Sequence, residues 1–426
     1  MSKNIVIIGN GISGVTCARQ LRKLDDSCKI TLISAETKYF YSRTALMYVY
    51  MGHMPFENTQ PYEKWFWEKN RIELVHGFVQ KVDTEKKQLF FSDGTAMIFD
   101  TLVLACGSMS NKFGWPGQEL KGVQGLFNYQ DLLNMEESTK GISSAVVVGG
   151  GLIGVEMAEM LHSRGIHVTF LVRENVFWGA VLPIEEAKMI ERHIKEYGID
   201  LRMETELHEI KGAGKVSSII TKNGEEFLCQ FVGLTVGVSP NIEFLKSSNI
   251  KIDKGILINE YFETNIPNVY AIGDCAQFEQ ALPGRRNIEQ VWYTGKEHGE
   301  TVAHTILGNR KAYFPGNWFN SAKFFDIEYQ TYGVVNATLK ENEATFYWEH
   351  QDGKKSFRVV YDKNTEAVLG FNAFGIRLRH EICDRWITQQ KKVGEVLKNL
   401  RDANFDPEFY KHYEIEIKNA FQLQMI

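Results

Sequence analysis

Two glycine fingerprints stand about 140 residues apart in the chain, and their residue types and spacing are those of a phosphate-binding turn. The first is VIIGNGISG, with Gly9, Gly11 and Gly14, and the second is VVVGGGLIG, with Gly149, Gly151 and Gly154. In this pattern the first glycine allows a tight turn, the second lets the backbone approach a pyrophosphate, and the third lets a helix pack closely on a strand. The phosphates lie at the positive N-terminal end of that helix. One copy could be only a tight strand-to-helix connection, whereas two copies indicate two dinucleotide sites.

Each fingerprint lies inside a beta-alpha-beta pattern. Apolar or alternating runs at 4–9 and 29–36 flank the helical pattern VTCARQLRKL, and SAVVVGGG, VEMAEMLHSRG and HVTFLVRE repeat the plan. Glu36 stands 22 residues after Gly14, at the end of the second run, where a carboxylate can accept hydrogen bonds from both ribose hydroxyls. We therefore predict two Rossmann-like domains with parallel sheets, one for each dinucleotide.

The rest of the chain completes an α/β protein with a third domain. Hairpin-like stretches are predicted at 72–83 and at 88–100, the second turning at Asp93-Gly94, and a further turn is predicted at Asn223-Gly224. From about Phe314 the chain alternates in aromatic strands, and helical periodicity follows from Arg379 to about Leu400. This pattern predicts a C-terminal α+β domain whose aromatic residues form a core or a subunit interface. The predicted division is 1–112 and 237–313 for the first dinucleotide domain, 113–236 for the second, and 314–426 for the third.

Composition narrows the class of partner and the compartment. The 426 residues carry a formal net charge of -5, which argues against a nucleic-acid binder that neutralises phosphates. Met1, Ser2 and Lys3 lead directly into the apolar run IVIIG, so we expect no signal peptide, and the absence of a run of about 18 apolar residues predicts no membrane span. Six cysteines without CxxC or zinc-ligand spacing are expected to be buried thiols, with no metal site. A cytoplasmic protein is the expectation.

Five motifs, which follow one another along the chain, indicate a family resemblance. Besides the two fingerprints, they are TLVLACGS ending at Gly107 and Ser108, LTVGVSPN at 234–241, and TNIPNVYAIGDCAQ at 264–277. Together they resemble the FAD-dependent pyridine nucleotide oxidoreductase superfamily over roughly residues 4–312. That superfamily includes glutathione and coenzyme A-disulfide reductases, rubredoxin and ferredoxin reductases, the flavoprotein part of nitrite reductase, and apoptosis-inducing factor.

The resemblance implies a set of FAD-binding residues. Asp274 would accept hydrogen bonds from the ribityl chain, and Glu36 would hold the adenosine ribose. The helix that starts near Glu289, Gln290, Val291 and Trp292 would lie against the flavin pyrimidine, where its N-terminal amides could stabilise negative charge on the reduced ring. The implied FAD set is Gly9, Gly11, Ser13, Gly14, Glu36, Arg43, Val79, Cys106, Gly107, Gly273, Asp274, Gln290, Val291 and Trp292.

The resemblance also implies an NAD(P)H set around the second fingerprint. Glu156 is the candidate for the nicotinamide side, although it could equally be an ordinary first-turn glutamate favoured by the helix dipole. The usual acidic ribose ligand falls at Val172, and Arg173 follows where NADPH-type relatives place an arginine for the 2'-phosphate. Gly154 and Glu174 favour NADH instead, which leaves a slight preference for NADPH. The implied set is Gly149, Gly151, Leu152, Ile153, Gly154, Glu156, Arg173 and Gly237.

One cysteine of the resembling disulfide reductases is missing. Coenzyme A-disulfide reductases have cysteine where this chain has Thr44, and a hydroxyl cannot serve as a redox nucleophile, so no thiol relay can pass through this position. The segment Tyr41 to Arg43 resembles the Tyr-x-Arg segment of rubredoxin reductase and nitrite reductase flavoproteins, which need no protein cysteine. Many of those have a lysine soon afterwards, and residues 46–50 supply none. Arg43 could substitute for that lysine, contact an FAD phosphate, or pair with a neighbouring carboxylate.

The expected function is that of an FAD-dependent NAD(P)H oxidoreductase. Hydride would pass from the nicotinamide to FAD, and electrons would pass on to a non-disulfide acceptor, a small electron-transfer protein or metal centre. Arg43 and Glu156 are the candidate catalytic residues. The alternatives are an NAD(P)H oxidase, a small-molecule or disulfide reductase if Cys17, Cys106 or Cys275 lay near the flavin, and a redox-responsive regulatory flavoprotein like apoptosis-inducing factor. The family resemblance also implies a homodimer.

Overall fold

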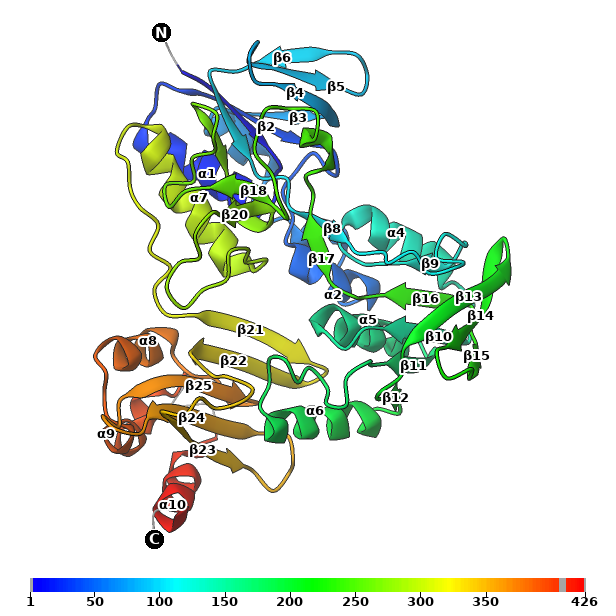
Figure 1. Cartoon of the computed structure of the whole chain (residues 1–426), viewed down its shortest axis with the longest axis vertical. Helices are drawn as coiled ribbons and strands as arrows, with labels where there is room; N and C mark the ends of the chain where they lie inside the picture. The colour runs from blue at the N-terminus through cyan, green and yellow to red at the C-terminus, as the bar shows by residue number, and fades with distance from the viewer. Residues whose placement is uncertain (1–2, 406–410, 425–426) are drawn as a thin grey trace. The chain divides into compact units, whose positions relative to one another are not determined.

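The computed structural model describes residues 3–405 and 411–424, and its contacts divide the chain into two compact units (Figure 1). The first unit consists of Met1–Asn111, Gly125–Ser138 and Gly237–Pro315. The second unit consists of Lys112–Gln124, Thr139–Val236 and Gly316–Ile426. Each unit is described on its own below.

The first unit is built around a five-stranded parallel sheet in the order β19-β7-β1-β2-β3. Four of its strands are almost continuous runs of buried residues, as expected for a parallel sheet covered on both faces, whereas the edge strand β3 has a single buried residue, Ile72. The strands are β1 (Asn4–Ile8), β2 (Lys29–Ser34), β3 (Ile72–His76), β7 (Thr101–Leu104) and β19 (Val269–Ala271). Its other strands are β4 (Val79–Asp83), β5 (Gln88–Phe91), β6 (Ala96–Ile98), β8 (Ser108–Ser110), β17 (Val238–Pro240), β18 (Ile256–Ile258) and β20 (Ala276–Phe278).

Two helices lie side by side in the first unit, α1 (Ile12–Leu24) and α7 (Trp292–Ile306) (Figure 1). Small residues allow this close approach: a Cβ on Gly299 would collide with the carbonyl oxygen of Ser13, and one on Gly295 would lie 2.7 Å from the Ser13 Oγ. The start of α1, which follows the first fingerprint, is thereby held against α7. The shorter helices of this unit are α2 (Leu46–Tyr50), α3 (Lys64–Lys69) and α4 (Tyr129–Ser138), with 3-10 turns η1 (Arg43–Ala45), η2 (Phe56–Thr59), η3 (Glu243–Leu245) and η4 (Gly273–Cys275).

The predicted hairpin at 72–83 is wrong. Strand β3 pairs in parallel with β2, with Ile72 opposite Ile30 and Leu74 opposite Leu32, whereas β4 pairs with β5 in a separate sheet. Pairing with β2 packs Ile72, Leu74 and Val75 against the core of the unit, so the burial of these apolar residues favours the parallel pairing. The hairpin at 88–100 is confirmed, because β5 and β6 pair antiparallel around the Asp93-Gly94 turn.

The second unit contains the other Rossmann-like sheet, with parallel strands in the order β12-β11-β10-β16-β9. Both beta-alpha-beta predictions are therefore confirmed, and so is the turn at Asn223-Gly224 between β14 and β15. The elements of this part are β9 (Val123–Gln124), β10 (Ser144–Val148), α5 (Leu152–Ser163), β11 (His167–Leu171), α6 (Ile184–Glu196), β12 (Asp200–Arg202), β13 (Leu207–Ala213), β14 (Lys215–Thr221), β15 (Glu226–Leu228) and β16 (Phe231–Leu234).

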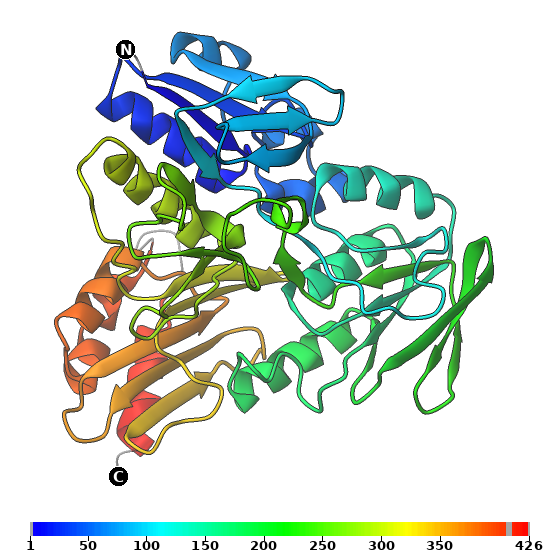
Figure 2. The same ribbon diagram turned by 45° about the horizontal axis from the view of Figure 1, so that its top comes forward.

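The C-terminal part of the second unit is a five-stranded antiparallel sheet with helices, which confirms the α+β prediction (Figure 2). Aromatic side chains of the sheet, including Phe346, Phe357 and Phe371, pack with Trp386 of a helix into one core. The predicted helical stretch from Arg379 is divided into two helices at Gln390, where the chain turns. The elements are β21 (Phe319–Phe324), β22 (Ile327–Gly333), β23 (Glu343–Glu349), β24 (Ser356–Asp362), β25 (Val368–Phe374), α8 (His380–Thr388), α9 (Val393–Lys398), η5 (Leu400–Ala403) and α10 (Glu414–Gln424).

Ion pairs join the two parts of the second unit. Arg358 of β24 lies 2.6 Å from Glu186 of α6, with side-chain exposures of 3% and 0%. Lys323 of β21 lies 2.8 Å from Glu159 of α5. The helices of the second Rossmann-like fold are thus anchored to the C-terminal sheet by charge-assisted hydrogen bonds. Among the described residues, no helix is long and apolar enough to span a membrane.

Candidate functional site

The first fingerprint has the geometry of a phosphate-binding turn. Gly9 has φ +113°, and a Cβ there would collide with the carbonyl of Ala105, while one on Gly14 would collide with the carbonyl of Gly9. Around Gly11, in contrast, no described atom lies within 4 Å of a Cβ position. Gly11 is also the N-cap of α1, and no described side chain caps its amides. Open space therefore faces uncapped amides, and a pyrophosphate fits this arrangement.

The second fingerprint repeats this geometry in the second unit. Gly149 also has φ +113°, and a Cβ there would lie 2.6 Å from the carbonyl oxygen of Thr235. A Cβ on Gly154 would collide with the carbonyl of Gly149, whereas Gly151 has no described atom within 4 Å. Gly151 caps α5 without a described side-chain partner for the amides, and Leu152 begins the first turn of the helix, followed by Ile153. The same space for a phosphate is present here.

Glu36 is the centre of a hydrogen-bonded cluster in the first unit. Arg43 donates to both of its oxygens, Nη2 to Oε2 at 2.9 Å and Nη1 to Oε1 at 3.2 Å, and the Tyr41 hydroxyl donates to Oε1. Arg43 Nη1 also donates to the carbonyl oxygen of Phe127 at 2.7 Å. Burial opposes the charge on Arg43, but the contacts with Tyr41 and Glu36 outweigh it, and the pKa of Arg43 is raised. Of the three possibilities left open for Arg43, the structure shows pairing with a neighbouring carboxylate.

Tyr129 is a residue of this cluster that sequence reasoning missed. Its backbone amide donates to Glu36 Oε1 at 2.8 Å, and its ring stacks on Phe56 with centroids 3.9 Å apart. It stands 93 residues from Glu36 at the start of α4, and no motif marks it. The amide donor adds to the two side-chain donors, so the carboxylate is held in one orientation.

Asp274 lies in a second hydrogen-bonded chain of the first unit. The Ser108 hydroxyl donates to Asp274 Oδ2 at 3.2 Å, and Gln290 Nε2 donates to the Ser108 Oγ at 2.7 Å. Burial raises the pKa of Asp274, and the hydrogen bond from Ser108 and the charge of Arg43 oppose this. Ser108 was not among the predicted site residues, although it follows Gly107 within a recognised motif. These two hydrogen bonds join Ser108 to Asp274 and Gln290, which are more than 160 residues away in the sequence, and they orient the carboxylate of Asp274.

His298 is another residue that the sequence did not single out. Its Nδ1 accepts a hydrogen bond from the backbone amide of Gly273 at 3.1 Å, and its ring lies 4.8 Å from that of Phe262. Burial, helped by the charge of Arg285, lowers the pKa of His298 to about 3. The imidazole is therefore neutral at ordinary pH and can accept the bond that holds the turn before Asp274.

The other predicted FAD residues differ in how far they are exposed to solvent. Val79 is buried in the core at the start of β4. Cys106 is partly exposed after β7, and its backbone amide would lie 3.3 Å from a Cβ on Gly9. Val291 is the N-cap of α7, and Trp292, its first residue, is 38% exposed. The predicted helix start is thus confirmed.

The predicted NAD(P)H residues lie between β10 and α5, on α5 and just after β11, with one exception. Gly237 belongs to the first unit, where its carbonyl accepts from the amide of Asn111 at 3.0 Å. Val172, at the position of the usual acidic ribose ligand, is fully buried, and a Cβ on Gly150 would lie 2.7 Å from it. The side chain of Arg173 is 72% exposed and lies 2.9 Å from Glu174. An exposed cation and an exposed anion therefore share this strand end.

Glu156 is not a first-turn residue, because α5 begins at Leu152. Its carboxyl is partly buried, and burial together with the nearby charge of Glu159 raises its pKa to about 7, against the opposing effect of Lys323. The alternative that it simply complements the dipole at the helix start is therefore wrong. A carboxyl with this pKa can gain or lose a proton near neutral pH.

No thiol lies in the segment that follows Glu36. Thr44 lies in η1, and its hydroxyl is 3.2 Å from that of Ser42. All six cysteines are free thiols outside residues 36–50, and five of them are buried. The expectation of buried thiols holds except for Cys106.

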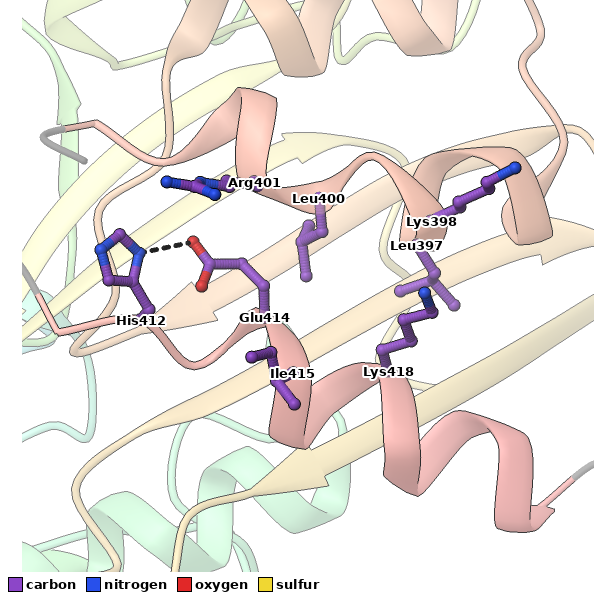
Figure 3. Close-up of a pocket in the computed structure, with 8 residues that line it drawn as sticks. All are labelled: Leu397, Lys398, Leu400, Arg401, His412, Glu414, Ile415 and Lys418. Atoms are coloured by element: carbon purple, nitrogen blue, oxygen red, sulfur yellow. Dashed lines mark ion pairs between the residues drawn. The ribbon is translucent and has the colours of Figure 1, made fainter.

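A cavity of about 340 Å³ opens in the C-terminal part of the second unit (Figure 3). Figure 3 shows Glu414 turned toward His412, whose Nδ1 lies 3.5 Å from the carboxylate. Its lining comes from α9, η5 and α10 and their flanks, namely Leu397, Lys398, Leu400, Arg401, His412, Glu414, Ile415 and Lys418. None of the predicted site residues lines it. Among the described residues, no cluster of three metal-ligating side chains is present.

Comparison with known proteins agrees with this geometry. The family model of the pyridine nucleotide-disulphide oxidoreductases matches residues 3–299. A nitrite reductase [NAD(P)H] of Bacillus subtilis is 30% identical over 82% of the chain, which spans only 43% of that relative's length. A benzene 1,2-dioxygenase system ferredoxin--NAD(+) reductase subunit of Pseudomonas putida is 25% identical over 94% of the chain and 98% of its own length.

Solved structures share the fold over the whole chain. An NAD-dependent persulfide reductase from A. fulgidus superposes with a TM-score of 0.85 at 23% identity, covering 99% of this chain and 83% of that one. The covalent putidaredoxin reductase-putidaredoxin complex gives a TM-score of 0.79 at 21% identity, covering 99% and 98%. The paired glycine turns, the parallel sheets that carry them and the family match lead to one conclusion: the chain belongs to the pyridine nucleotide-disulphide oxidoreductase family.

Proposed function

We propose that this enzyme passes electrons from NAD(P)H through FAD to a small electron-transfer protein or metal centre, and not to a disulfide. The observation that carries the proposal is Thr44. Its hydroxyl lies beside Ser42 in the turn that follows the Glu36 cluster, where disulfide reductases need a thiolate. A hydroxyl cannot form the mixed disulfide or take up electrons from a flavin. Electrons must therefore leave the flavin without a protein thiol at this position.

The residues of the first unit fit FAD, and each has a distinct part in holding it. The amides at the start of α1 would bind the pyrophosphate. Glu36 would accept a hydrogen bond from the adenosine ribose at Oε2, because Oε1 already accepts from Tyr41, Arg43 and Tyr129. Asp274, oriented by Ser108, would accept from the ribityl hydroxyls. FAD, when bound, supplies the ability to accept a hydride and release electrons singly.

The start of α7 would provide the polar environment for reduced flavin. Val291 caps this helix in extended conformation without a described side-chain hydrogen bond to the amides. Uncapped amides at a helix N-terminus carry partial positive charge, which stabilises an anion placed against them. We assign this helix end the role of stabilising the negative charge of the reduced ring.

The nucleotide site is proposed to prefer NADPH slightly. Val172 is buried and uncharged, so it cannot accept hydrogen bonds from ribose hydroxyls, and the next residue, Arg173, exposes a guanidinium that suits a 2'-phosphate. Glu174 opposes this preference, because its carboxylate pairs with Arg173 and would repel a phosphate. The balance between the two side chains predicts a small selectivity.

Relatives support an electron-transfer protein as the acceptor. The Pseudomonas relative is named as a ferredoxin--NAD(+) reductase subunit, and the structure of putidaredoxin reductase is that of a covalent complex with putidaredoxin. Sulfur-reducing relatives also occur, such as the NAD(P)H sulfur oxidoreductase (CoA-dependent) of Pyrococcus abyssi, at 28% identity. The hydroxyl of Thr44 supports the first group, the reductases of electron-transfer proteins.

A stopped-flow panel tests the proposal. The enzyme is reduced anaerobically with NADPH or NADH and mixed with rubredoxin, ferredoxin, oxygen, or coenzyme A disulfide, while flavin absorbance is followed. We expect reoxidation by one of the iron-sulfur or iron proteins to be the fastest. A dominant rate with the disulfide would contradict the argument from Thr44, and a dominant rate with oxygen would make the enzyme an oxidase. Slow reoxidation by every acceptor, with a long-lived charge-transfer band, would identify a regulatory flavoprotein.

A further inference from the structure

A buried ion pair lies beside the start of α7 and has no part in the function proposed above. Arg285 and Glu289 belong to the segment that joins β20 to α7, and their side chains are 7% and 9% exposed. Arg285 Nε donates to Glu289 Oε1 at 2.7 Å, and its Nη2 donates to Oε2 at 2.9 Å. Two parallel hydrogen bonds of this kind form the strongest arginine–carboxylate pairs. Removal of either partner would leave the other charge buried without compensation.

Further hydrogen bonds hold the pair in one place within the first unit. Thr294, the third residue of α7, is 2% exposed, and its hydroxyl donates to Glu289 Oε2 at 3.3 Å. Arg285 Nη1 donates to the carbonyl oxygen of Pro315 at 3.3 Å. The carboxylate of Glu289 is therefore fixed against the first turn of α7, although Glu289 itself stands two residues before the N-cap, Val291.

The residue after Glu289 connects the pair with the hydrogen-bonded chain of Asp274. Gln290 Nε2 donates to the Ser108 Oγ at 2.7 Å, and the Ser108 hydroxyl donates to Asp274 at 3.2 Å. The ion pair is thus next in sequence to a side chain that reaches the place proposed for the ribityl group of FAD. A carboxylate here brings negative charge to the helix end at which the uncapped amides carry partial positive charge. The guanidinium of Arg285 cancels that negative charge.

Other titratable groups of α7 also interact with Arg285. Glu297 accepts a hydrogen bond from the Tyr313 hydroxyl at 2.8 Å, and burial raises the pKa of Glu297 against the opposing charge of Arg285. The charge of Arg285 adds to the effect of burial that keeps His298 neutral. Burial opposes the charge on Arg285 itself, but the contacts with Glu289 outweigh it, and the pKa of Arg285 is raised. Arg285 therefore keeps its charge in these buried surroundings.

We propose that Arg285 and Glu289 are positioning residues that set the reduction potential of the flavin, because their charges cancel beside the start of α7. This inference rests on the proposed function, which places FAD against that helix end. Reduction adds negative charge to the flavin ring, so an uncompensated carboxylate nearby disfavours the reduced form and an uncompensated guanidinium favours it. With both charges present, the helix amides dominate the local field.

The test measures the midpoint potential of the FAD-loaded chain by anaerobic reductive titration against a reference dye at pH 9, where the carboxylates are ionised. In Arg285→Gln we expect the equilibrium constant for two-electron reduction to fall about tenfold, which lowers the potential by about 30 mV. In Glu289→Gln we expect it to rise about tenfold, with an equal shift upwards. The double variant, and Arg285→Lys, which keeps the charge, should lie near the wild-type potential.

The opposite signs separate an effect of charge from a loosened helix start, since a purely structural role would shift both single variants in the same direction. Lys296→Gln is the matched control, because Lys296 forms an exposed pair with Glu300 on the same helix, at 3.5 Å. Solvent screens that pair, so the control should keep the wild-type potential. Shifts of the same sign in the two single variants would overturn the proposal, and so would wild-type potentials in both. If Arg285→Gln does not fold, an upward shift in Glu289→Gln still supports the proposal and any other result contradicts it.

Failure of the proposed function would look different. The flavin absorbance of each purified chain shows whether FAD is bound before any potential is measured. A wild-type chain that cannot bind FAD would overturn the cofactor assignment and this inference together. A chain that binds and reduces FAD without the opposite shifts would overturn only the role of the ion pair. A disulfide or oxygen as the fastest acceptor in the stopped-flow panel would change the proposed acceptor and leave the measured potentials as they are.

Discussion

The guanidinium of Arg43 lies 2.9 Å from the carboxylate of Glu36, and the two side chains form a pair with 33% and 18% side-chain exposure. Arg43 also donates to the carbonyl of Phe127, and the charge of Asp274 contributes to its raised pKa. One cation thus interacts with both carboxylates that the proposed FAD site uses. The pairing makes Arg43 a positioning residue for Glu36, since a fixed carboxylate loses less entropy when it binds a ribose.

Replacing Arg43 should therefore weaken FAD binding. In Arg43→Gln the two charge-assisted hydrogen bonds to Glu36 are lost, and we expect the Kd for FAD to rise by about 10- to 100-fold, as for the loss of one such interaction. Titration of the apoprotein with FAD, followed by quenching of flavin fluorescence, measures this directly.

Arg310→Gln is the matched control, because Arg310 forms an exposed pair with Glu263 in the same unit. Its FAD affinity should equal that of the wild type. Equal affinity in Arg43→Gln would remove Arg43 from the site.

His298 should make the stability of the protein depend on pH. Its pKa in the folded state is about 3, below the ordinary value of 6.5, so the unfolded chain binds one more proton between these pH values. Stability is therefore fully present above pH 6.5 and falls by about 1.4 kcal/mol for each unit as the pH decreases toward 3. Urea denaturation of the wild type and His298→Asn at pH 5 and pH 7 should show a smaller loss between the two pH values in the variant. An identical loss in both proteins would contradict the neutral, buried imidazole.

Glu156 should make the stability of the protein decrease as the pH rises, which is opposite to the effect of His298. Burial raises its folded pKa to about 7, so its contribution is fully present below the unfolded pKa near 4.5 and is lost as the pH rises through 7. Glu156→Gln, which stays neutral, should raise the urea midpoint relative to the wild type at pH 8 and leave it nearly unchanged at pH 5. A midpoint shift of the same size at both pH values would mean that the carboxyl does not titrate in this range.

Arg173 and Glu174 should change nucleotide selectivity in opposite senses. Arg173→Ala is expected to raise the KM for NADPH about tenfold and to leave that for NADH nearly unchanged, since only NADPH carries the 2'-phosphate. Glu174→Ala removes the carboxylate that pairs with Arg173 and should lower the KM for NADPH. Steady-state reduction of ferricyanide with each nucleotide gives both constants. If both variants retain wild-type KM values for both nucleotides, this strand end does not contact the ribose.

Local sequence patterns were sufficient to predict those elements whose stabilising interactions lie within a short segment. A glycine turn between an apolar strand and a helix is determined within about ten residues, so both fingerprints and the strands that flank them could be located correctly from the sequence. The start of α7 at Trp292 agrees with the helix start that the family resemblance implied. The prediction of a hairpin at 72–83 was wrong, because the sequence pattern there is compatible both with a hairpin and with two strands of different sheets. Only the tertiary burial of β3 beside β2 distinguishes them.

The sequence by itself determined that this protein has two dinucleotide-type glycine turns and lacks the cysteine of the disulfide reductases, because glycine spacing and Thr44 are properties of short segments. Only the tertiary structure decided which groups orient the carboxylates. The Tyr129 amide reaches Glu36 across 93 residues, and Ser108 reaches Asp274 across 166. Such contacts depend on parallel strands brought together by long crossover connections, and no local pattern encodes the distance between their ends.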